Sequence, residues 1–227
     1  MRRRMIVCSI LVSLFLINVF VFCHKDNDGT YVGTTFADPH QISQFVLYGS
    51  DNNKFTIYEP VTSVEESKVG SDLLNKANFR PLKGKDIFDY DKNLLFVGEV
   101  EDESGDILQH IQQQYIVNDG WDFIIFSAYE IKGFNMDLYD KNKDIFGNKV
   151  NIYKINGEKV VQVELSNKGL NYYYYIYDKE DKDNNLYMGV TRANEIFTYQ
   201  NGILYYVAYT IDVENDTILD ILDNFIK

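Results

Sequence analysis

The order of hydrophobic and polar positions divides the chain into three parts. Residues 6–22 are an uncharged apolar run directly after three arginines, and residues 23–39 are polar and contain glycines. From residue 40 onward, short runs of alternating apolar and polar residues are separated by turn-forming residues, which is typical of β-strands. The pattern therefore predicts a signal peptide or membrane anchor at 1–22, a flexible tether at 23–39 and one domain at 40–227.

The strand-like runs account for most of the domain. Residues 44–58 predict a hairpin around the sequence SDNN, and residues 71–77 predict a short helix with Ser71 as its N-cap. The later strand-like runs are 94–102, 106–117, 121–131, 149–155, 158–165, 171–178, 186–191, 194–200 and 203–213. Because these runs are joined by short connections, we expect an antiparallel sheet.

Two turns and one helix complete the predicted fold. The pairs Asn156-Gly157 and Asn201-Gly202 each lie between strand-like runs, where a two-residue hairpin loop needs positive φ. Near the C-terminus, Ile218, Ile221, Leu222 and Phe225 follow the spacing of one helix face. We therefore expect an α+β fold: a single domain with a twisted, mostly antiparallel sheet of about seven to nine strands and a C-terminal helix packed on one face.

Cys23 decides how the N-terminal segment is used. It directly follows the apolar run, as the modified cysteine of a bacterial lipoprotein does, but Phe22 stands where such signals have a small residue. Three outcomes are open: lipidation of Cys23, retention of residues 6–22 as an anchor helix, or cleavage without lipidation and secretion. Because the arginines precede the apolar run, the domain is expected to face outward from the cell membrane, in the cell envelope.

The charge of the chain limits its partners. The formal net charge is −12, and residues 1–22 carry three arginines and no acids, so the remainder stands at −15. Such an acidic protein repels phosphate backbones, so nucleic acid is excluded as a partner. It also repels anionic lipid headgroups, so contact with the membrane is expected through the N-terminal segment alone.

The sequence carries no recognisable catalytic or metal-binding motif. The three histidines are scattered, and the sequence contains no GxSxG motif or phosphate-binding glycine loop. The acidic stretches 140–151 and 181–192 lack both the glycine and the glutamate that a calcium loop requires, and are interpreted as solvated turns. We therefore predict no catalytic residue, no metal, no cofactor and no enzymatic activity. The alternative is an envelope hydrolase with an unrecognised carboxylate site.

Tyrosine is concentrated in two runs. On a strand, Tyr173, Tyr175 and Tyr177 share one face, and the partner run places Tyr205 and Tyr209 on one face. One interpretation is that both strands are central and covered on both faces. The other is that these five tyrosines form an aromatic platform for a protein or a hydrophobic ligand. In contrast, the strand EKVVQVEL alternates so regularly that Gln162 and Glu164 are expected on a solvated face.

Three segments carry a resemblance to a known family: YIVNDGWDFIIF, NKVNIYKINGEKV and IFTYQNGILYYVAYTIDVENDTILDILDNFI. Over about its C-terminal half, the chain resembles a domain of unknown function in extracytoplasmic proteins of spore-forming Gram-positive bacteria. That domain also occurs at the outer ends of some membrane-spanning anti-sigma factors, and its layout is similar to periplasmic lipoprotein-carrier-type folds. The resemblance implies an outward-facing α+β domain and supplies no catalytic residue. Only Met1 to Met5 precede the apolar run, so no cytoplasmic domain that grips a sigma factor is expected.

Taken as a whole, the sequence predicts a membrane-tethered extracytoplasmic binding or sensing protein.

Overall fold

The structure is a computed structural model. It describes residues 54–57, 90–101, 105–117, 122–144, 147–165, 172–177, 186–212 and 214–225, and the single positions 60, 73 and 75. The predicted segments 1–22 and 23–39, including Cys23, lie outside the described residues. Among the residues that are described, no helix is both long enough and apolar enough to cross a membrane.

The centre of the fold is an antiparallel sheet of eight strands. Its spatial order is β1-β2-β3-β4-β10-β9-β6-β5. The strands are β1 (Lys54–Ile57), β2 (Lys92–Glu101), β3 (Ile107–Val117), β4 (Asp122–Glu130), β5 (Val150–Ile155), β6 (Glu158–Val163), β9 (Asn194–Gln200) and β10 (Ile203–Tyr209). The strands from β2 to β4 are neighbours in sequence and in space, as short connections favour, whereas β10 returns to pair with β4.

Both Asn-Gly pairs form the predicted hairpin turns. Asn156 and Gly157 have φ values of 53° and 91° between β5 and β6, and Asn201 and Gly202 have 51° and 82° between β9 and β10. Asparagine and glycine accept this left-handed conformation more readily than other residues, so the sequence itself fixes these two turns.

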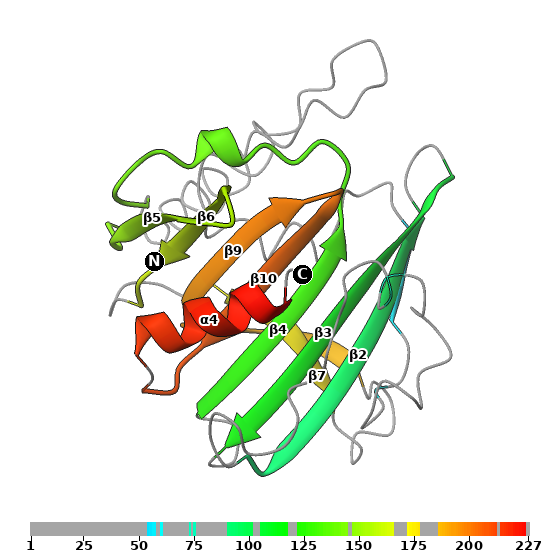
Figure 1. Ribbon diagram of the computed structural model, residues 1–227. Helices are drawn as coiled ribbons and strands as arrows, with labels where there is room; N and C mark the ends of the chain where they lie inside the picture. The colour runs from blue at the N-terminus through cyan, green and yellow to red at the C-terminus, as the bar shows by residue number, and fades with distance from the viewer. Residues whose placement is uncertain are drawn as a thin grey trace, which may run out of the picture.

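The remaining elements cover the two faces of this sheet. Helix α4 (Asn215–Phe225) lies in front of it in Figure 1, and the hairpin of β7 (Tyr172–Tyr177) and β8 (Leu186–Thr191) lies behind it. The hairpin is a separate two-stranded sheet. The segment after β4, which includes the 3-10 helix η3 (Met136–Leu138), packs on the hairpin side.

Two hydrophobic cores result from this layering. The helix-side core includes Ile218 and Leu222 of α4, and the hairpin-side core includes Tyr172 and Tyr175 of β7. Successive residues of a strand point to opposite faces, so β10 contributes Tyr206 to the hairpin side and Tyr205 to the helix side. All seven residues of β10 are buried because both faces are covered.

The predicted fold class is confirmed: an α+β, sheet-dominated single domain with a C-terminal helix on one face. The clearest difference concerns the tyrosine strands. β7 pairs with β8 in its own layer, whereas β10 pairs with β4 and β9 in the large sheet. The two tyrosine runs are therefore not partners. Hairpins of similar composition can pair within one sheet or stack as layers, and local pattern does not distinguish these outcomes.

Candidate functional site

Six polar or phenolic side chains meet between the large sheet and the β7–β8 hairpin. This interlayer cluster consists of Gln112 and Gln114 from β3, Ser127 and Tyr129 from β4, and Tyr172 and Tyr175 from β7. All six residues are at most 1 % exposed. Buried polar groups are tolerated only when they are hydrogen-bonded, so their mutual bonds determine what the cluster can do.

The two glutamines bind the backbone of β7. The Gln112 Oε1 atom accepts a hydrogen bond from the Tyr175 N–H at 2.9 Å, and the Gln114 Nε2 atom donates to the Tyr175 carbonyl oxygen at 2.7 Å. Gln114 Nε2 also donates to Gln112 Oε1 at 2.7 Å, which aligns the two amides. Side-chain amides therefore take the place that a neighbouring strand would occupy at this residue.

The amide nitrogen of Gln112 faces three hydroxyl groups. It lies 3.2 Å from Tyr129 Oη, 3.4 Å from Tyr172 Oη and 3.5 Å from Ser127 Oγ. These contacts are at the long end of the hydrogen-bonding range, so each is weaker than the bonds to Tyr175. Together they tie β3, β4 and β7 to one another across the two layers.

The sequence places these groups by simple alternation. Gln112 and Gln114 are two residues apart on β3 and point to the hairpin side, whereas Gln113 points to the helix side. Sequence reasoning missed this site. A signal was present, because three successive glutamines in a strand flanked by apolar residues must bury at least one amide.

Burial holds His110 and the three tyrosines of the cluster in their neutral forms. Loss of solvation raises the pKa of Tyr129 to about 12 and raises the pKa values of Tyr172 and Tyr175 well above the ordinary value. Burial also lowers the pKa of His110 to about 3; its ring packs edge-on against Tyr129 at a centroid distance of 5.2 Å. At neutral pH these groups therefore offer hydrogen bonds and aromatic surface, and no charge.

Aromatic rings continue from the cluster across the hairpin-side core. The ring of Tyr172 stacks on Tyr206 at 5.7 Å and lies 6.3 Å from Tyr174 of its own strand. Tyr206 stacks on Phe197 at 5.5 Å, and Tyr174 stacks on Phe123 at 6.0 Å. Such stacking contributes beyond area burial, so β7 is held by rings as well as by the glutamines.

The structure divides the five tyrosines that were predicted to bind a ligand. Tyr175 is buried at 0 % exposure, and Tyr173 and Tyr177 are half-buried and pack against the hairpin-side core. Tyr205 and Tyr209 belong to the helix-side core, at 4 % and 2 % exposure. The five side chains thus lie on opposite sides of the large sheet and do not meet as one platform. Ligand binding by any of them stays a prediction.

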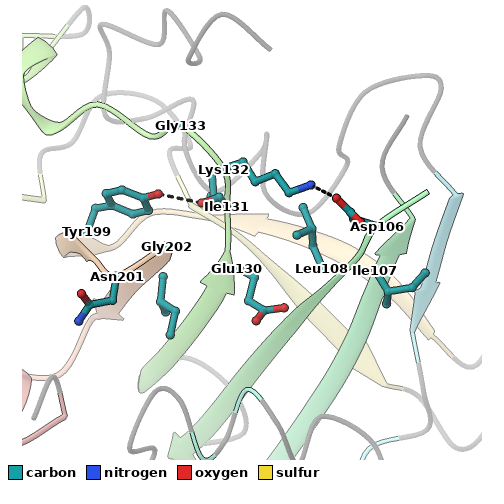
Figure 2. A pocket seen from close by; sticks show the side chains of 11 residues that line it. Asp106, Ile107, Leu108, Glu130, Ile131, Lys132, Gly133, Tyr199, Asn201 and Gly202 are labelled. Atoms are coloured by element: carbon teal, nitrogen blue, oxygen red, sulfur yellow. Dashed lines mark hydrogen bonds and ion pairs between the residues drawn. The ribbon is translucent and has the colours of Figure 1, made fainter. Parts of the chain in front are cut away.

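A shallow hollow of about 640 Å³ lies at one end of the large sheet (Figure 2). Lys132 reaches across it to form an ion pair with Asp106. Glu130 Oε2 accepts a hydrogen bond from the Gln109 N–H at 2.8 Å, and Tyr199 Oη donates to the Ile131 carbonyl oxygen at 2.9 Å. Asp106 and Glu130 therefore each have a structural partner at this hollow.

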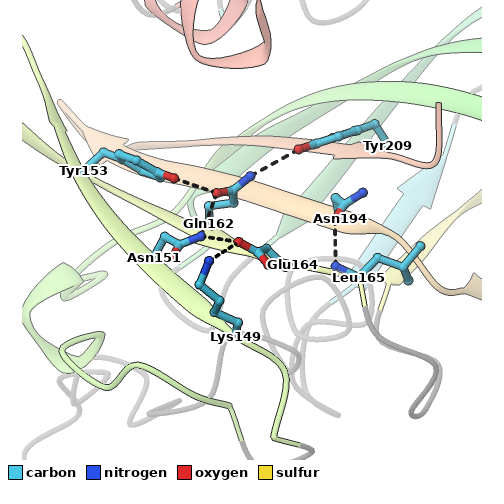
Figure 3. A network of polar contacts seen from close by, with 8 residues as sticks. All are labelled: Lys149, Asn151, Tyr153, Gln162, Glu164, Leu165, Asn194 and Tyr209. Carbon is cyan, nitrogen blue, oxygen red and sulfur yellow. Dashed lines mark hydrogen bonds and ion pairs between the residues drawn. The ribbon is translucent and has the colours of Figure 1, made fainter. Parts of the chain in front are cut away.

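A second polar network crosses the helix-side face (Figure 3). Gln162 Oε1 accepts from Tyr153 Oη at 3.0 Å and from Asn151 Nδ2 at 3.1 Å, and Gln162 Nε2 donates to Tyr209 Oη at 3.3 Å. Gln162 is 0 % exposed, which corrects the prediction of a solvated face. The pattern of the strand was right, but tyrosines from β5 and β10 cover this face and supply the partners of the amide.

The network reaches solvent at Glu164. Its Oε1 atom accepts from Asn151 Nδ2 at 2.7 Å and from Lys149 Nζ at 2.7 Å, and these bonds lower the pKa of Glu164. The bond to Glu164 in turn raises the pKa of Lys149. Glu164 is thus held in its charged form at the end of β6, as an exposed ion pair.

The acidic stretch 140–151 contains a closed turn. Asp144 Oδ1 accepts from the Asn148 N–H at 2.7 Å, its second carboxylate oxygen accepts from Asn148 Nδ2, and Asp144 is only 8 % exposed. This turn is therefore buried at Asp144 rather than fully solvated. Within the described ranges, no group of three or more His, Cys, Asp or Glu side chains is arranged to hold a metal ion. The second stretch, 181–192, lies partly outside the described residues.

Comparison of the chain with models of protein families, with curated proteins and with solved structures found no match. Function is therefore inferred from the residues and the fold alone.

Proposed function

We propose that the protein is a membrane-tethered, outward-facing binding or sensing protein without catalytic activity. Its partner is a protein or a hydrophobic ligand. The tether is supported by the arginines at positions 2–4, the apolar run at 6–22 and the position of Cys23 directly after it. The acidic remainder of the chain keeps the domain away from anionic headgroups.

One observation favours binding over catalysis. The two glutamine amides of the interlayer cluster bond to a peptide backbone, at Tyr175 N–H and C=O. Burial keeps the adjacent His110 and Tyr129 neutral across the physiological pH range, so neither group is suited to exchange protons with a substrate. Hydrogen-bond recognition is the chemistry that such a neutral site performs well.

Metabolic labelling with a clickable fatty acid tests the tether. Wild type and Cys23→Ala are expressed in a bacterial host, and membranes, cytosol and medium are separated. Label that is incorporated by the wild type and lost in the variant supports lipidation of Cys23. Full-length unlabelled protein in the membrane supports the anchor helix. Release of both proteins into the medium would refute the tethered form of the proposal.

Protease added to intact cells tests the orientation. An outward-facing domain is degraded in intact cells that have been stripped of their wall, while a cytoplasmic marker is spared. Protection of the domain until the membrane is broken would contradict the outward orientation.

A further inference from the structure

The β7–β8 hairpin leaves and rejoins the large sheet at one place. β6 ends at Val163 and β9 begins at Asn194, and Val163 is the register partner of Glu195. The hairpin is thus inserted between two strands that already pair with each other. At this point the Leu165 N–H donates to Asn194 Oδ1 at 2.7 Å and joins the two ends. Movement about this single base does not require any strand of the large sheet to separate.

Side chains of the large sheet hold the hairpin against it. Among the described strands, β7 and β8 pair with each other alone, with Tyr172 opposite Thr191 and Tyr177 opposite Leu186. Alternate residues of an antiparallel strand direct their N–H and C=O away from the partner strand. At Tyr175 those outward groups bond to the two glutamines of β3. This arrangement is the way a protein binds an extended peptide, here with a strand of its own chain.

The face under the hairpin is also shaped for aromatic side chains of a strand. Tyr175 packs against Phe96 at a centroid distance of 5.6 Å, and Tyr172 stacks on Tyr206 at 5.7 Å. Both tyrosines are 0 % exposed. The recognised pattern is therefore an extended backbone with two large aromatic residues three positions apart, and its hydrogen bonds to Gln112 and Gln114 are independent of sequence.

We propose that the β7–β8 hairpin is an exchangeable strap, and that the face beneath it accepts an extended, aromatic-bearing strand of a partner polypeptide in place of β7. The proposal rests on the proposed binding function, because it names the partner class and the place where the partner binds. The tether at Cys23 has no part in it, so the labelling experiment and the experiments below succeed or fail separately.

Native-state hydrogen exchange on the full-length chain in non-ionic detergent tests the exchange of the strap. Amides of β7 and β8 are expected to exchange at least tenfold faster than those of β9 and β10, because the strap opens without unfolding the sheet. Tyr172→Ala provides a loosened form. It removes the ring that stacks on Tyr206 at 5.7 Å and the hydroxyl that lies 3.4 Å from Gln112 Nε2, and it leaves Gln112 and Gln114 intact. Equal protection of the hairpin and the sheet in the wild type would overturn the proposal.

A labelled peptide with the sequence NYYYYIYD, residues 171–178, is the binding probe. In fluorescence anisotropy, the full-length Tyr172→Ala protein is expected to bind it at least tenfold more tightly than the wild type, because the peptide supplies the tyrosine that the strap has lost. Adding Gln112→Met and Gln114→Met to Tyr172→Ala should abolish the gain, because methionine keeps the length of glutamine and loses its amide.

N-methylated peptides distinguish recognition of the peptide backbone from non-specific hydrophobic binding. Methylation at the residue equivalent to Tyr175 removes the N–H that donates a hydrogen bond to Gln112 Oε1, and should weaken binding at least tenfold. Methylation at the residue equivalent to Tyr174 is the matched control, because its N–H points to the opposite edge and its peptide should bind as the parent does. Equal affinity of both methylated peptides, or no saturable binding to Tyr172→Ala, would overturn the proposal.

Discussion

Replacing Gln112 by leucine removes the residue that joins both layers of the fold. Gln112 Oε1 accepts from Tyr175 N–H at 2.9 Å and from Gln114 Nε2 at 2.7 Å. Its Nε2 atom makes three further contacts at 3.2–3.5 Å. Leucine fills a similar volume, so the main effect of Gln112→Leu is the loss of these hydrogen bonds rather than a cavity.

The expected loss of stability follows from the groups that are left behind. Gln114 keeps its bond to the Tyr175 carbonyl oxygen, but the buried Tyr175 N–H loses its acceptor. A stranded buried polar group costs about 1–3 kcal/mol, and the other lost bonds add about 1 kcal/mol. We therefore expect the free energy of unfolding to fall by about 3 kcal/mol, with the hairpin affected first.

Urea unfolding of the full-length chain in non-ionic detergent, followed by near-UV circular dichroism, measures this effect. Gln113→Leu is the matched control. Gln113 is equally buried and adjacent in sequence, but it faces the helix side, and its Oε1 atom has no hydrogen-bond partner among the described residues. Its Nε2 atom donates to Asn93 Oδ1, but Asn93 is partly exposed, so water can replace this bond. Its loss should change stability by less than about 1 kcal/mol. Equal effects of the two substitutions, or no effect of Gln112→Leu, would refute the reasoning.

Three further predictions concern buried or strained groups. Because burial lowers the pKa of His110 from 6.5 to about 3, its contribution to stability is present above pH 6.5 and is lost as the pH falls. Urea unfolding should therefore show a decrease of about 2 kcal/mol between pH 6.5 and pH 5, which His110→Phe abolishes. Tyr206→Phe removes a buried hydroxyl without a hydrogen-bond partner among the described residues, so thermal unfolding should show unchanged or increased stability. Gly157→Ala introduces a side chain at φ 91° and should lower stability in the same assay by about 1 kcal/mol, whereas Asn156→Gly should be tolerated. A stable Gly157→Ala variant would contradict the left-handed turn.

The sequence by itself determined the local structure of the described domain. Alternating apolar and polar residues predicted β2, β3, β4 and the later strands, because every second side chain of a pleated strand points to the same face of the sheet. Asn156-Gly157 and Asn201-Gly202 predicted two hairpins, because few other residues accept their φ values. Ile218 and Leu222 predicted the buried face of α4 through their helical spacing. Each of these features depends on residues that are close in sequence.

The tertiary structure alone decided which faces are covered, and with that the candidate site. The sequence of β7 and that of β10 are similar in character, yet one strand lies in the hairpin layer and the other in the centre of the large sheet. By residue type, Gln112 and Gln162 would be placed at solvated positions. In the structure both are buried, and their hydrogen-bond partners Tyr175 and Tyr209 lie more than 40 residues further along the chain. Layer stacking depends on contacts between distant segments, which a local hydrophobic pattern does not encode.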